Sequence, residues 1–401
     1  MTAYLDHAAT TPMLPDAVSA MAQELARAGN ASSLHGSGRR ARRVVEEARE
    51  SLGALIGAGP SEIIFTSGGT EADNLAIKGL FWQRRSTDPR RRRILVSAVE
   101  HHAVLDAAQW LGRSEHGEVV LLPVDRTGRV DLDVLESELS ADPDAVALVS
   151  VMWANNEVGT VQPVRELAEL AHVHGVPVHC DAVQAFGGLP VDFAASGVDC
   201  LTLSGHKIGG PVGVGALVAR RGLDLVPVLH GGGQERRIRS GTLDTAAIHA
   251  LAVAAGVTVD RREAEAARVS ALRDALVDGI LDTVPDAVPH GDTAPGGRVP
   301  GIAHLTFPGC EGDSLLYLLD ARGVECSTGS ACQAGIPQPS HVLLAMGVPE
   351  DQARGALRFS LGWTLTTADV EAAVEAIGAA VARARRAGLA GVAPTAGVVR
   401  A

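Results

Sequence analysis

The sequence contains almost no lysine. Arginine supplies nearly all of the positive charge, because only Lys78 and Lys207 occur among the 401 residues. Any chemistry that needs a lysine amine therefore has two candidates. The formal net charge of -12 argues against a surface that follows nucleic-acid phosphates, since such a surface needs clustered Lys and Arg. The arginine-rich segment at residues 84–93 could dock an acidic partner or tRNA, although a solvated loop is the commoner explanation.

Cysteine patterns and long apolar runs are also absent. The five cysteines are odd in number, widely spaced and without a C-x-x-C pair, which excludes a disulfide framework and a zinc knuckle and indicates a reducing compartment. No apolar run reaches the roughly 18 to 20 residues of a membrane helix, and the N-terminus lacks the features of a signal peptide. We therefore expect a cytoplasmic protein with no membrane partner and no bound metal.

The pattern of apolar runs predicts the fold class. Between about residues 63 and 219, short and often continuously apolar runs alternate with helical patterns, which indicates a parallel sheet covered on both faces. We predict an α/β fold, with a mostly parallel seven-stranded sheet in a large domain at residues 17–252. Residues 1–16 and 253–388 should form a smaller α+β domain, and residues 389–401 a flexible tail. In such sheets, ligands bind beyond the carboxyl ends of the strands.

A glycine-rich segment, S-G-G-T-E-A-D-N at residues 67–74, follows one apolar run and opens a helical pattern. Small residues at a helix N-terminus present free N–H groups to an anion, and the helix dipole adds about 0.3 to 1 kcal/mol. Gly68, Gly69 and Thr70 are therefore a candidate phosphate cradle, with an ordinary strand-to-helix turn as the alternative. The segment lacks the G-x-x-x-x-G-K-[ST] pattern, which disfavours a nucleoside-triphosphate loop.

Two polar residues stand in the motif H-C-D-A-V-Q, which ends another apolar run. Asp181 either caps a turn or meets a positive charge, such as a protonated pyridine nitrogen. Gln184 either reaches a phenolic oxygen of such a ring or is a surface residue of a helix. The residues alone leave both alternatives open.

Lys207 has the sequence context of a reactive amine. It lies in S-G-H-K-I-G-G-P, directly after an apolar strand pattern, where a solubilising surface lysine would be poorly placed. Partial desolvation there would lower its pKa and free the amine to form a Schiff base. Lys78 lies in the amphipathic stretch N-L-A-I-K-G-L-F-W, and we expect it to be a solvated helix residue.

A set of motifs occurs in one order along the chain: Y-L-D-H-A-A-T-T-P, S-G-G-T-E-A-D-N-L-A, E-H-H-A-V-L, N-N-E-V-G, H-C-D-A-V-Q, S-G-H-K-I-G-G-P, R-S-G-T and S-T-G-S-A-C. Together they resemble the cysteine desulfurases of the NifS/IscS type, which are fold-type-I enzymes of the class V aminotransferase group. The resemblance spans Tyr4 to about Gly362. It implies pyridoxal 5'-phosphate (PLP) as cofactor and conversion of L-cysteine to L-alanine, with an enzyme persulfide that supplies iron–sulfur clusters or thiolated molecules.

The resemblance also implies residue roles. Lys207 would bind the cofactor and move protons, Asp181 would pair with the pyridinium, and His101 would stack on the ring and act in acid/base steps. Arg358 would clamp the substrate carboxylate, a task that suits a bidentate guanidinium. The remaining implied contacts are Asn156 to substrate and ring oxygen, Gln184 to ring oxygen, Thr70, Ser204 and His206 to phosphate beside Gly69, and Thr242 from the partner subunit of a homodimer. His102 is expected to be structural.

Cys332 is the cysteine that the resemblance assigns to the sulfur step. Gly329 and Gly335 flank it with the backbone freedom of a mobile loop. Because an ordinary thiol has a pKa near 8.5, only a few per cent is thiolate at about pH 7, and the site must assist. Cys326 is expected to be a buried inert thiol. Packed positions are likewise expected for Cys180, Cys200 and Cys310.

The sequence leaves four alternatives to the cysteine desulfurase function. An aminotransferase needs no thiol at position 332, whereas a selenocysteine lyase could share it. A catalytically silent sulfur-complex scaffold should have lost one of the key residues. A metal hydrolase on His101 and His102 is disfavoured, because we expect these adjacent histidines to lie on a strand, where they point apart, and no carboxylate cluster accompanies them. Two departures from the family leave the sulfur acceptor, an iron–sulfur scaffold or a thiolation enzyme, unidentified. These are Q-A-G-I-P-Q-P-S-H after Cys332, and a C-terminal tail without aromatic and acidic residues.

Overall fold

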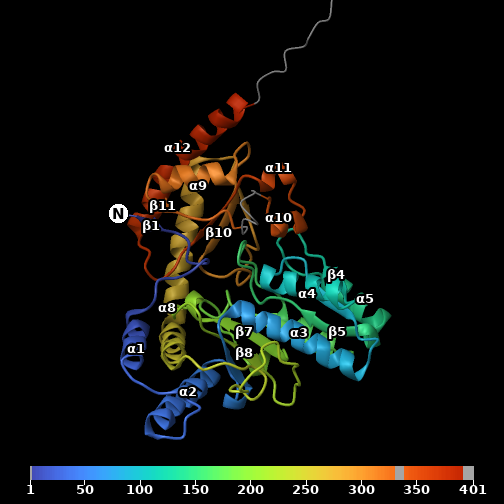
Figure 1. The fold of residues 1–401 in the computed structure, drawn as a ribbon. Coiled ribbons are helices and arrows are strands. Elements are labelled where there is room, and N and C mark those ends of the chain that lie inside the picture. Colours follow the sequence, from blue (N-terminus) through green and yellow to red (C-terminus); the bar gives the residue numbers. More distant parts are fainter. Residues whose placement is uncertain (1, 330–337, 392–401) are drawn as a thin grey trace, which may run out of the picture.

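A seven-stranded sheet forms the centre of the larger part of the molecule (Figure 1). The structure is a computed structural model that describes residues 2–329 and 338–391. The strands are β2 (Ile63–Thr66), β3 (Arg93–Ser97), β4 (Glu118–Leu122), β5 (Val146–Ser150), β6 (Val178–Asp181), β7 (Cys200–Ser204) and β8 (Gly215–Ala219). Their order is β2-β8-β7-β6-β5-β3-β4, and only β8 runs against its neighbours. The predicted α/β fold with a mostly parallel seven-stranded sheet is confirmed.

Helices cover both faces of this sheet, which explains why strands such as V-A-L-V-S are apolar throughout. One apolar cluster joins the sheet to α3 (Gly69–Thr87) and α4 (His102–Ser114). Another joins the opposite face to α2 (Gly36–Leu55), α5 (Leu132–Ala141) and α6 (Val164–Val173). Shorter helices are α1 (Pro15–Leu25), α7 (Phe193–Ser196), η1 (Pro60–Glu62), η2 (Pro143–Ala145) and η3 (Gly205–Lys207). The N-termini of α3 and α4 therefore lie at the sheet edge where the parallel strands end.

The smaller part of the molecule has its own sheet and its own core. Strand β10 (Ile302–Thr306) pairs antiparallel with β9 (Val288–His290) and β12 (Ala356–Ser360), while β1 (Ala3–Tyr4) pairs with β11 (Val324–Glu325). The helices are α9 (Gly312–Asp320), α10 (His341–Ala345), α11 (Glu350–Ala353) and α12 (Thr367–Gly391). Leu5 joins Phe307 and Leu357 in this core, so the N-terminal segment packs with the C-terminal part of the chain.

One long helix, α8 (Thr245–Thr283), runs from the larger part of the molecule into the smaller one (Figure 1). Its first half buries Ala247 and Leu251 in the core of the large sheet, and its second half buries Leu276 and Ile280 in the smaller core. The predicted domain boundary at residues 252/253 falls inside this helix, and the division into two domains stays a prediction. The predicted tail lies outside the described residues from position 392 onward.

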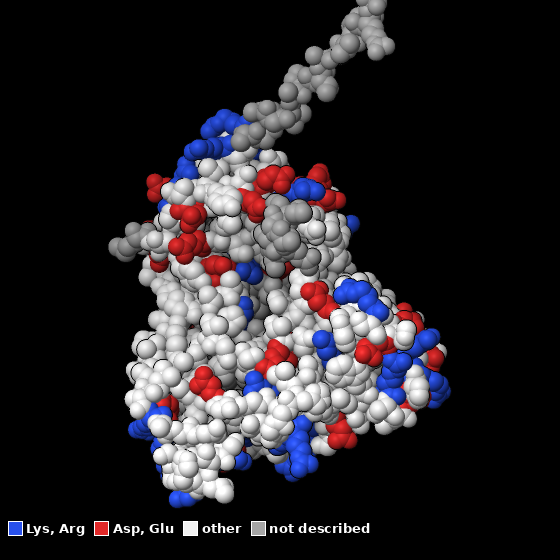
Figure 2. Space-filling view, viewed as in Figure 1, with Lys and Arg blue, Asp and Glu red and all other residues white. Residues whose placement is uncertain are grey.

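The arginine-rich segment at 84–93 is engaged by acceptors of the same chain. Arg90 pairs with Asp88 at 2.8 Å, and Arg93 lies 3.3 Å from Glu118. Figure 2 shows acidic and basic side chains interleaved near α4 and α5. These contacts favour an ordinary surface role for the segment. Within residues 2–329 and 338–391, no helix combines the length and apolar character needed to cross a membrane.

Candidate active site

Lys207 lies at the carboxyl end of β7, in the short helix η3. Its Nζ donates hydrogen bonds to the carbonyl oxygens of Ala8 at 2.6 Å and Ala9 at 2.8 Å. Burial, and then the charge of Arg358, lowers the pKa of Lys207 to about 8, against an opposing effect of Asp181. The neutral fraction of this amine near neutral pH is therefore far larger than that of an ordinary lysine, which favours a nucleophilic role.

Asp181 is the last residue of β6, and its side chain is buried. Its Oδ1 accepts a hydrogen bond from the backbone N–H of Val183 at 2.8 Å, so it does cap a turn. Burial, and then repulsion by Asp73, raises the pKa of Asp181 to about 7, while Lys207 lowers it. The two sequence alternatives are therefore compatible, because a carboxylate that caps a turn with one oxygen still faces a positive charge.

The predicted phosphate cradle forms the start of α3. Gly68 is its N-cap, with a φ of 148° that favours glycine, and a Cβ there would meet nothing within 4 Å. A Cβ on Gly69 would come within 3.6 Å of Ser204 Cβ, so the end of β7 lies beside this turn. The backbone N–H groups of Gly69 and Thr70, in the first turn of α3, have no acceptor within the helix. The predicted Gly69, Thr70 and Ser204 are therefore brought together.

His101 is the N-cap of α4, and His102 is the first residue of that helix. The assumption that these histidines lie on a strand was wrong, because β3 ends at Ser97. His101 Nδ1 accepts a hydrogen bond from the N–H of Ala103 at 3.1 Å, which assigns the ring proton to Nε2. Desolvation, and then the charge of Lys207, lowers the pKa of His101 to about 4, so the ring is neutral at neutral pH.

His102 contacts structural partners instead of the lysine. Its Nδ1 lies 3.2 Å from Asp106 Oδ1, and its ring lies 5.0 Å from that of His341. Among the residues that the structure describes, no group of three or more His, Cys, Asp and Glu side chains could hold a metal ion. The metal-hydrolase alternative therefore gains no support.

Arg358 is a buried residue of β12, and its charge acts on Lys207. Its Nη2 donates to Asp6 Oδ1 at 2.7 Å, and its Nη1 donates to the backbone oxygen of Asn156 at 3.1 Å. Its Nε has no hydrogen-bond partner among the described residues. The sequence did not single out Asp6, although it lies in the Y-L-D-H motif. Asp6 meets Arg358 only because β12 packs beside the N-terminal segment of the chain.

Three further predicted residues have different surroundings. Gln184 Nε2 donates to the carbonyl oxygen of Ala8 at 2.8 Å, close to the lysine. His206 Nδ1 lies 3.3 Å from Thr10 Oγ1, and desolvation lowers its pKa to about 4. Thr242 is exposed before α8, and its role in the site of a partner subunit stays a prediction.

The described cysteines have the character of packed residues. Cys326 is buried, and burial raises its pKa to about 12, so its thiolate is strongly disfavoured. Cys180, Cys200 and Cys310 are also buried with raised pKa values. The expectation that these four cysteines are buried or packed is confirmed. Cys332 lies outside the described residues.

Lys78 is not the solvated helix residue that the sequence predicted. It is half-buried, and its Nζ lies 4.6 Å from the centre of the Trp110 ring. This cation–π contact pairs α3 with α4, and burial lowers the pKa of the amine. The amphipathic pattern missed the contact because Trp110 comes from another helix.

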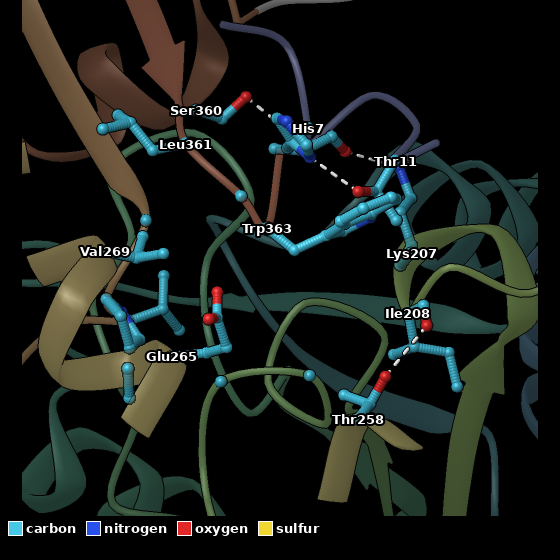
Figure 3. Close-up of a pocket in the computed structure, with 18 of the residues that line it drawn as sticks. His7, Thr11, Lys207, Ile208, Thr258, Glu265, Val269, Ser360, Leu361 and Trp363 are labelled. Carbon is cyan, nitrogen blue, oxygen red and sulfur yellow. Dashed lines mark hydrogen bonds between the residues drawn. The ribbon is translucent and has the colours of Figure 1, made fainter. Parts of the chain in front are cut away.

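A cavity of about 240 Å³ adjoins Lys207 between the two parts of the molecule. Figure 3 shows Lys207 and Ile208 on one side of it and Glu265 and Val269 of α8 on the other. Trp363 follows β12 and lines the same cavity, with its Nε1 donating to the carbonyl oxygen of Pro12 at 3.1 Å. The catalytic lysine candidate is therefore bounded by the large sheet, the N-terminal segment and the smaller part of the chain.

This arrangement of a buried lysine, a strand-end aspartate and a glycine turn agrees with the family that the chain matches. The sequence pattern described as aminotransferase class-V covers residues 3–373, so the chain belongs to this family. Relatives of this chain that are named IscS or IscS-like cysteine desulfurases confirm the resemblance to the NifS/IscS group.

The relatives match over nearly the whole chain. An IscS-like cysteine desulfurase of Mycobacterium tuberculosis is 58% identical over 388 residues, which cover 97% of this chain and 98% of that protein. A cysteine desulfurase IscS of Dictyoglomus turgidum is 42% identical, over 92% of this chain and 91% of that protein. A solved NifS-like protein superposes with a TM-score of 0.87 at 34% identity, covering 96% of this chain and all (100%) of the other.

Proposed function

We propose that this protein is a PLP-dependent cysteine desulfurase that converts L-cysteine to L-alanine and forms a persulfide on Cys332. The observation that carries the proposal is the desolvated amine of Lys207, whose pKa is also lowered by the charge of Arg358 and raised by that of Asp181. The relatives named cysteine desulfurase support the choice of reaction. An aminotransferase would use the same lysine, so the fate of the sulfur distinguishes the two reactions.

The residues present fit PLP. The open space beside Gly68 and the free N–H groups of Gly69 and Thr70 suit its phosphate, with Ser204 beside them. His206 would contact the phosphate from the short helix that follows Ser204. Asp181 suits a protonated ring nitrogen, because burial disfavours its negative charge and a positive partner stabilises that charge. When bound, PLP supplies an electron sink that weakens bonds at the substrate's carbon atoms.

The side chains of the site have separate tasks. Arg358 binds the substrate carboxylate through its guanidinium, which Asp6 holds in place at 2.7 Å. Lys207 Nζ accepts and returns a proton, because its pKa of about 8 permits both states near neutral pH. His101 offers a proton at Nε2, since its Nδ1 is already engaged by Ala103. The thiolate of Cys332 attacks the substrate sulfur, and the carbon–sulfur bond breaks with its electron pair left on the carbon. Protonation of that carbon gives alanine, while the sulfur stays on Cys332 as a persulfide.

The proposal extends to the assembly and its partners. The protein acts as a homodimer in the cytoplasm, with Thr242 of each subunit contacting the cofactor phosphate of the other. A protein acceptor, either an iron–sulfur scaffold or a thiolation enzyme, then takes the persulfide sulfur. Exposure of Thr242 on the surface supports its availability to a second subunit.

The test is to incubate the PLP-loaded protein with L-cysteine without reductant, quantify alanine and map persulfide by peptide mass spectrometry. We expect alanine together with persulfide on Cys332. The Cys332→Ala variant should bind PLP and lose sulfur transfer, whereas Cys326→Ala should resemble the wild type because that thiol is buried. A keto acid with unmodified Cys332 would assign the protein to the aminotransferases instead.

Lys207→Ala tests the cofactor attachment separately. This variant should lose the visible absorbance of lysine-bound PLP, while Lys78→Ala should keep it. An unchanged spectrum in Lys207→Ala would remove the assignment of this lysine.

A further inference from the structure

Beneath Asp181 lies a group of buried ionisable side chains that the proposed mechanism does not use. Asp73 of α3 is 1% exposed, and His179 of β6 is 0% exposed. His179 precedes Asp181 by two residues on the strand, so both side chains point to the same face of the sheet. The closeness of Asp73 to this pair makes it part of the surroundings that set the charge of Asp181.

His179 is held by hydroxyl groups from the two neighbouring strands. Its Nδ1 lies 2.9 Å from Ser150 Oγ on β5, and its Nε2 lies 3.0 Å from Thr202 Oγ1 on β7. The same Nε2 is 3.5 Å from Asp73 Oδ1, an oxygen with no hydrogen-bond partner among the described residues, and the hydroxyl of Thr202 lowers the pKa of Asp73. These four side chains therefore form one continuous chain of hydrogen-bonding groups.

The direction of the hydrogen bonds in this chain depends on the proton of Asp73. Burial lowers the pKa of His179 to about 4, so one ring nitrogen donates and the other accepts at neutral pH. When Asp73 is ionised it accepts from Thr202, which accepts from His179 Nε2. When Asp73 is protonated, every bond can reverse, and His179 Nδ1 donates to Ser150. In either state Ser150, His179 and Thr202 keep their hydrogen bonds to one another, which makes a buried proton on Asp73 tolerable.

We propose that Asp73 is a positioning residue for the cofactor, because the proton it holds controls the charge that Asp181 presents to the ring nitrogen. This inference rests on the proposed function, which takes Asp181 as the partner of that nitrogen. Asp73 that keeps its proton exerts no repulsion on Asp181, which then ionises at lower pH. When Asp73 loses its proton, its negative charge repels that of Asp181, and Asp181 ionises only at higher pH.

The pKa values of the neighbouring groups agree with this coupling. Burial raises the pKa of Asp73 to about 7, and burial followed by repulsion from Asp73 raises that of Asp181 to about 7. The other ionisable groups that act on the two aspartates or feel their charge are Glu100 before α4, His179 and Cys180 on β6, and Lys207 after β7. Burial raises the pKa of Glu100 well above its usual range.

The test measures the affinity for pyridoxamine 5'-phosphate, whose amine cannot form the bond to Lys207 and whose fluorescence reports binding. Its dissociation constant is measured from about pH 5 to about pH 9 for the apoproteins. We expect the wild-type affinity to rise as Asp181 ionises, and Asp73→Asn to move this rise to lower pH by on the order of one unit. The ligand's own titrations are common to both proteins and cancel in the comparison.

Two further variants complete the design. Asp133→Asn makes the same chemical change at an exposed position at the start of α5 and should leave the pH profile unchanged. Thr202→Val keeps the side-chain shape and removes the bond that lowers the pKa of Asp73, so its profile should also move to lower pH. A merely structural role of Asp73 would weaken binding equally at every pH.

The outcomes separate the two proposals. If the wild type binds the probe but both Asp73→Asn and Thr202→Val keep its pH profile, the coupling is overturned. If the wild type binds the probe at no pH, the proposed cofactor is overturned, and the inference falls with it.

Discussion

Lys207 and Asp181 illustrate how one physical cause acts in opposite directions on two residues of the site. Burial disfavours charge, so it lowers the pKa of the lysine to about 8 and raises that of the aspartate to about 7. Both groups therefore change charge near neutral pH, whereas ordinary side chains of these types would stay fully ionised. A site poised in this way can exchange protons with a bound substrate at small cost.

Arg358 is the residue whose substitution should act on substrate binding more than on chemistry. Arg358→Lys keeps the charge but loses the fork that can contact Asp6 and a substrate carboxylate together. We expect the KM for L-cysteine to rise by about tenfold to a hundredfold, with a smaller change in kcat. Steady-state alanine production measures both. Arg354→Lys is the control, because Arg354 is an exposed residue that pairs with the exposed Glu350. An unchanged KM in Arg358→Lys would contradict the clamp.

At the scale of elements, the segment before α8 is anchored by a buried ion pair. Arg49 donates to both oxygens of Glu235, at 2.8 and 2.6 Å, and the N–H of Phe65 donates to the same carboxylate at 3.0 Å. Arg236 and Arg237 next to it have positive φ angles of 50° and 61°, which are strained for residues with a Cβ. The buried pair therefore holds the backbone that leads to Thr242.

Removing one partner of this pair should destabilise the protein strongly. Arg49→Met leaves the Glu235 carboxylate buried without its cation, and we expect a loss of about 3 to 5 kcal/mol in the free energy of unfolding. Arg42→Met on the same helix breaks only the exposed pair with Glu46 and should cost less than about 1 kcal/mol. Urea unfolding followed by circular dichroism compares the two. Equal effects would mean that the buried pair is not the anchor.

The sequence predicted the parts of the site that lie at the ends of strands. Lys207 and Asp181 follow apolar runs, and parallel strands bring their carboxyl ends to one edge. Contacts between distant segments could not be predicted, since Asp6 and Arg358 are 352 residues apart and meet only through packing. The helix start at His101 was missed for a local reason, because the apolar run continued past Ser97 in sequence but not in backbone conformation.

At the scale of the whole molecule, the proposed dimer makes a prediction about mixed subunits. Lys207→Ala and Thr242→Ala are each expected to impair cofactor binding when present in both subunits. In a mixed dimer, the subunit with Thr242→Ala keeps its own Lys207 and receives an intact Thr242 from its partner. Random pairing of the two variants makes about half of the dimers mixed, and one of the two sites in each mixed dimer is intact, so about a quarter of all sites should regain absorbance in the visible range. No restoration would place Thr242 in its own subunit's site.

The buried histidines should make the fold sensitive to acid. The pKa values of His7, His101, His179, His206 and His290 are lowered to about 4, and that of His304 lies well below its usual range. An unfolded histidine titrates near 6.5, so below about pH 6.5 the unfolded chain binds more protons and stability falls. The raised pKa values of Asp73, Glu100 and Asp181 act oppositely over this range, since these groups keep protons in the folded state. Six groups against three leave an excess of about three protons.

The midpoint of urea unfolding of the apoprotein should therefore fall between about pH 6.5 and about pH 4.5. His304 isolates one contribution, because its ring is 1% exposed and neither nitrogen has a hydrogen-bond partner among the described residues. His304→Leu removes one group that must stay neutral in the fold, so its stability should depend less steeply on pH, by about 1.4 kcal/mol per pH unit. Identical slopes for the two proteins would mean that His304 binds its proton equally well in the folded and unfolded chain.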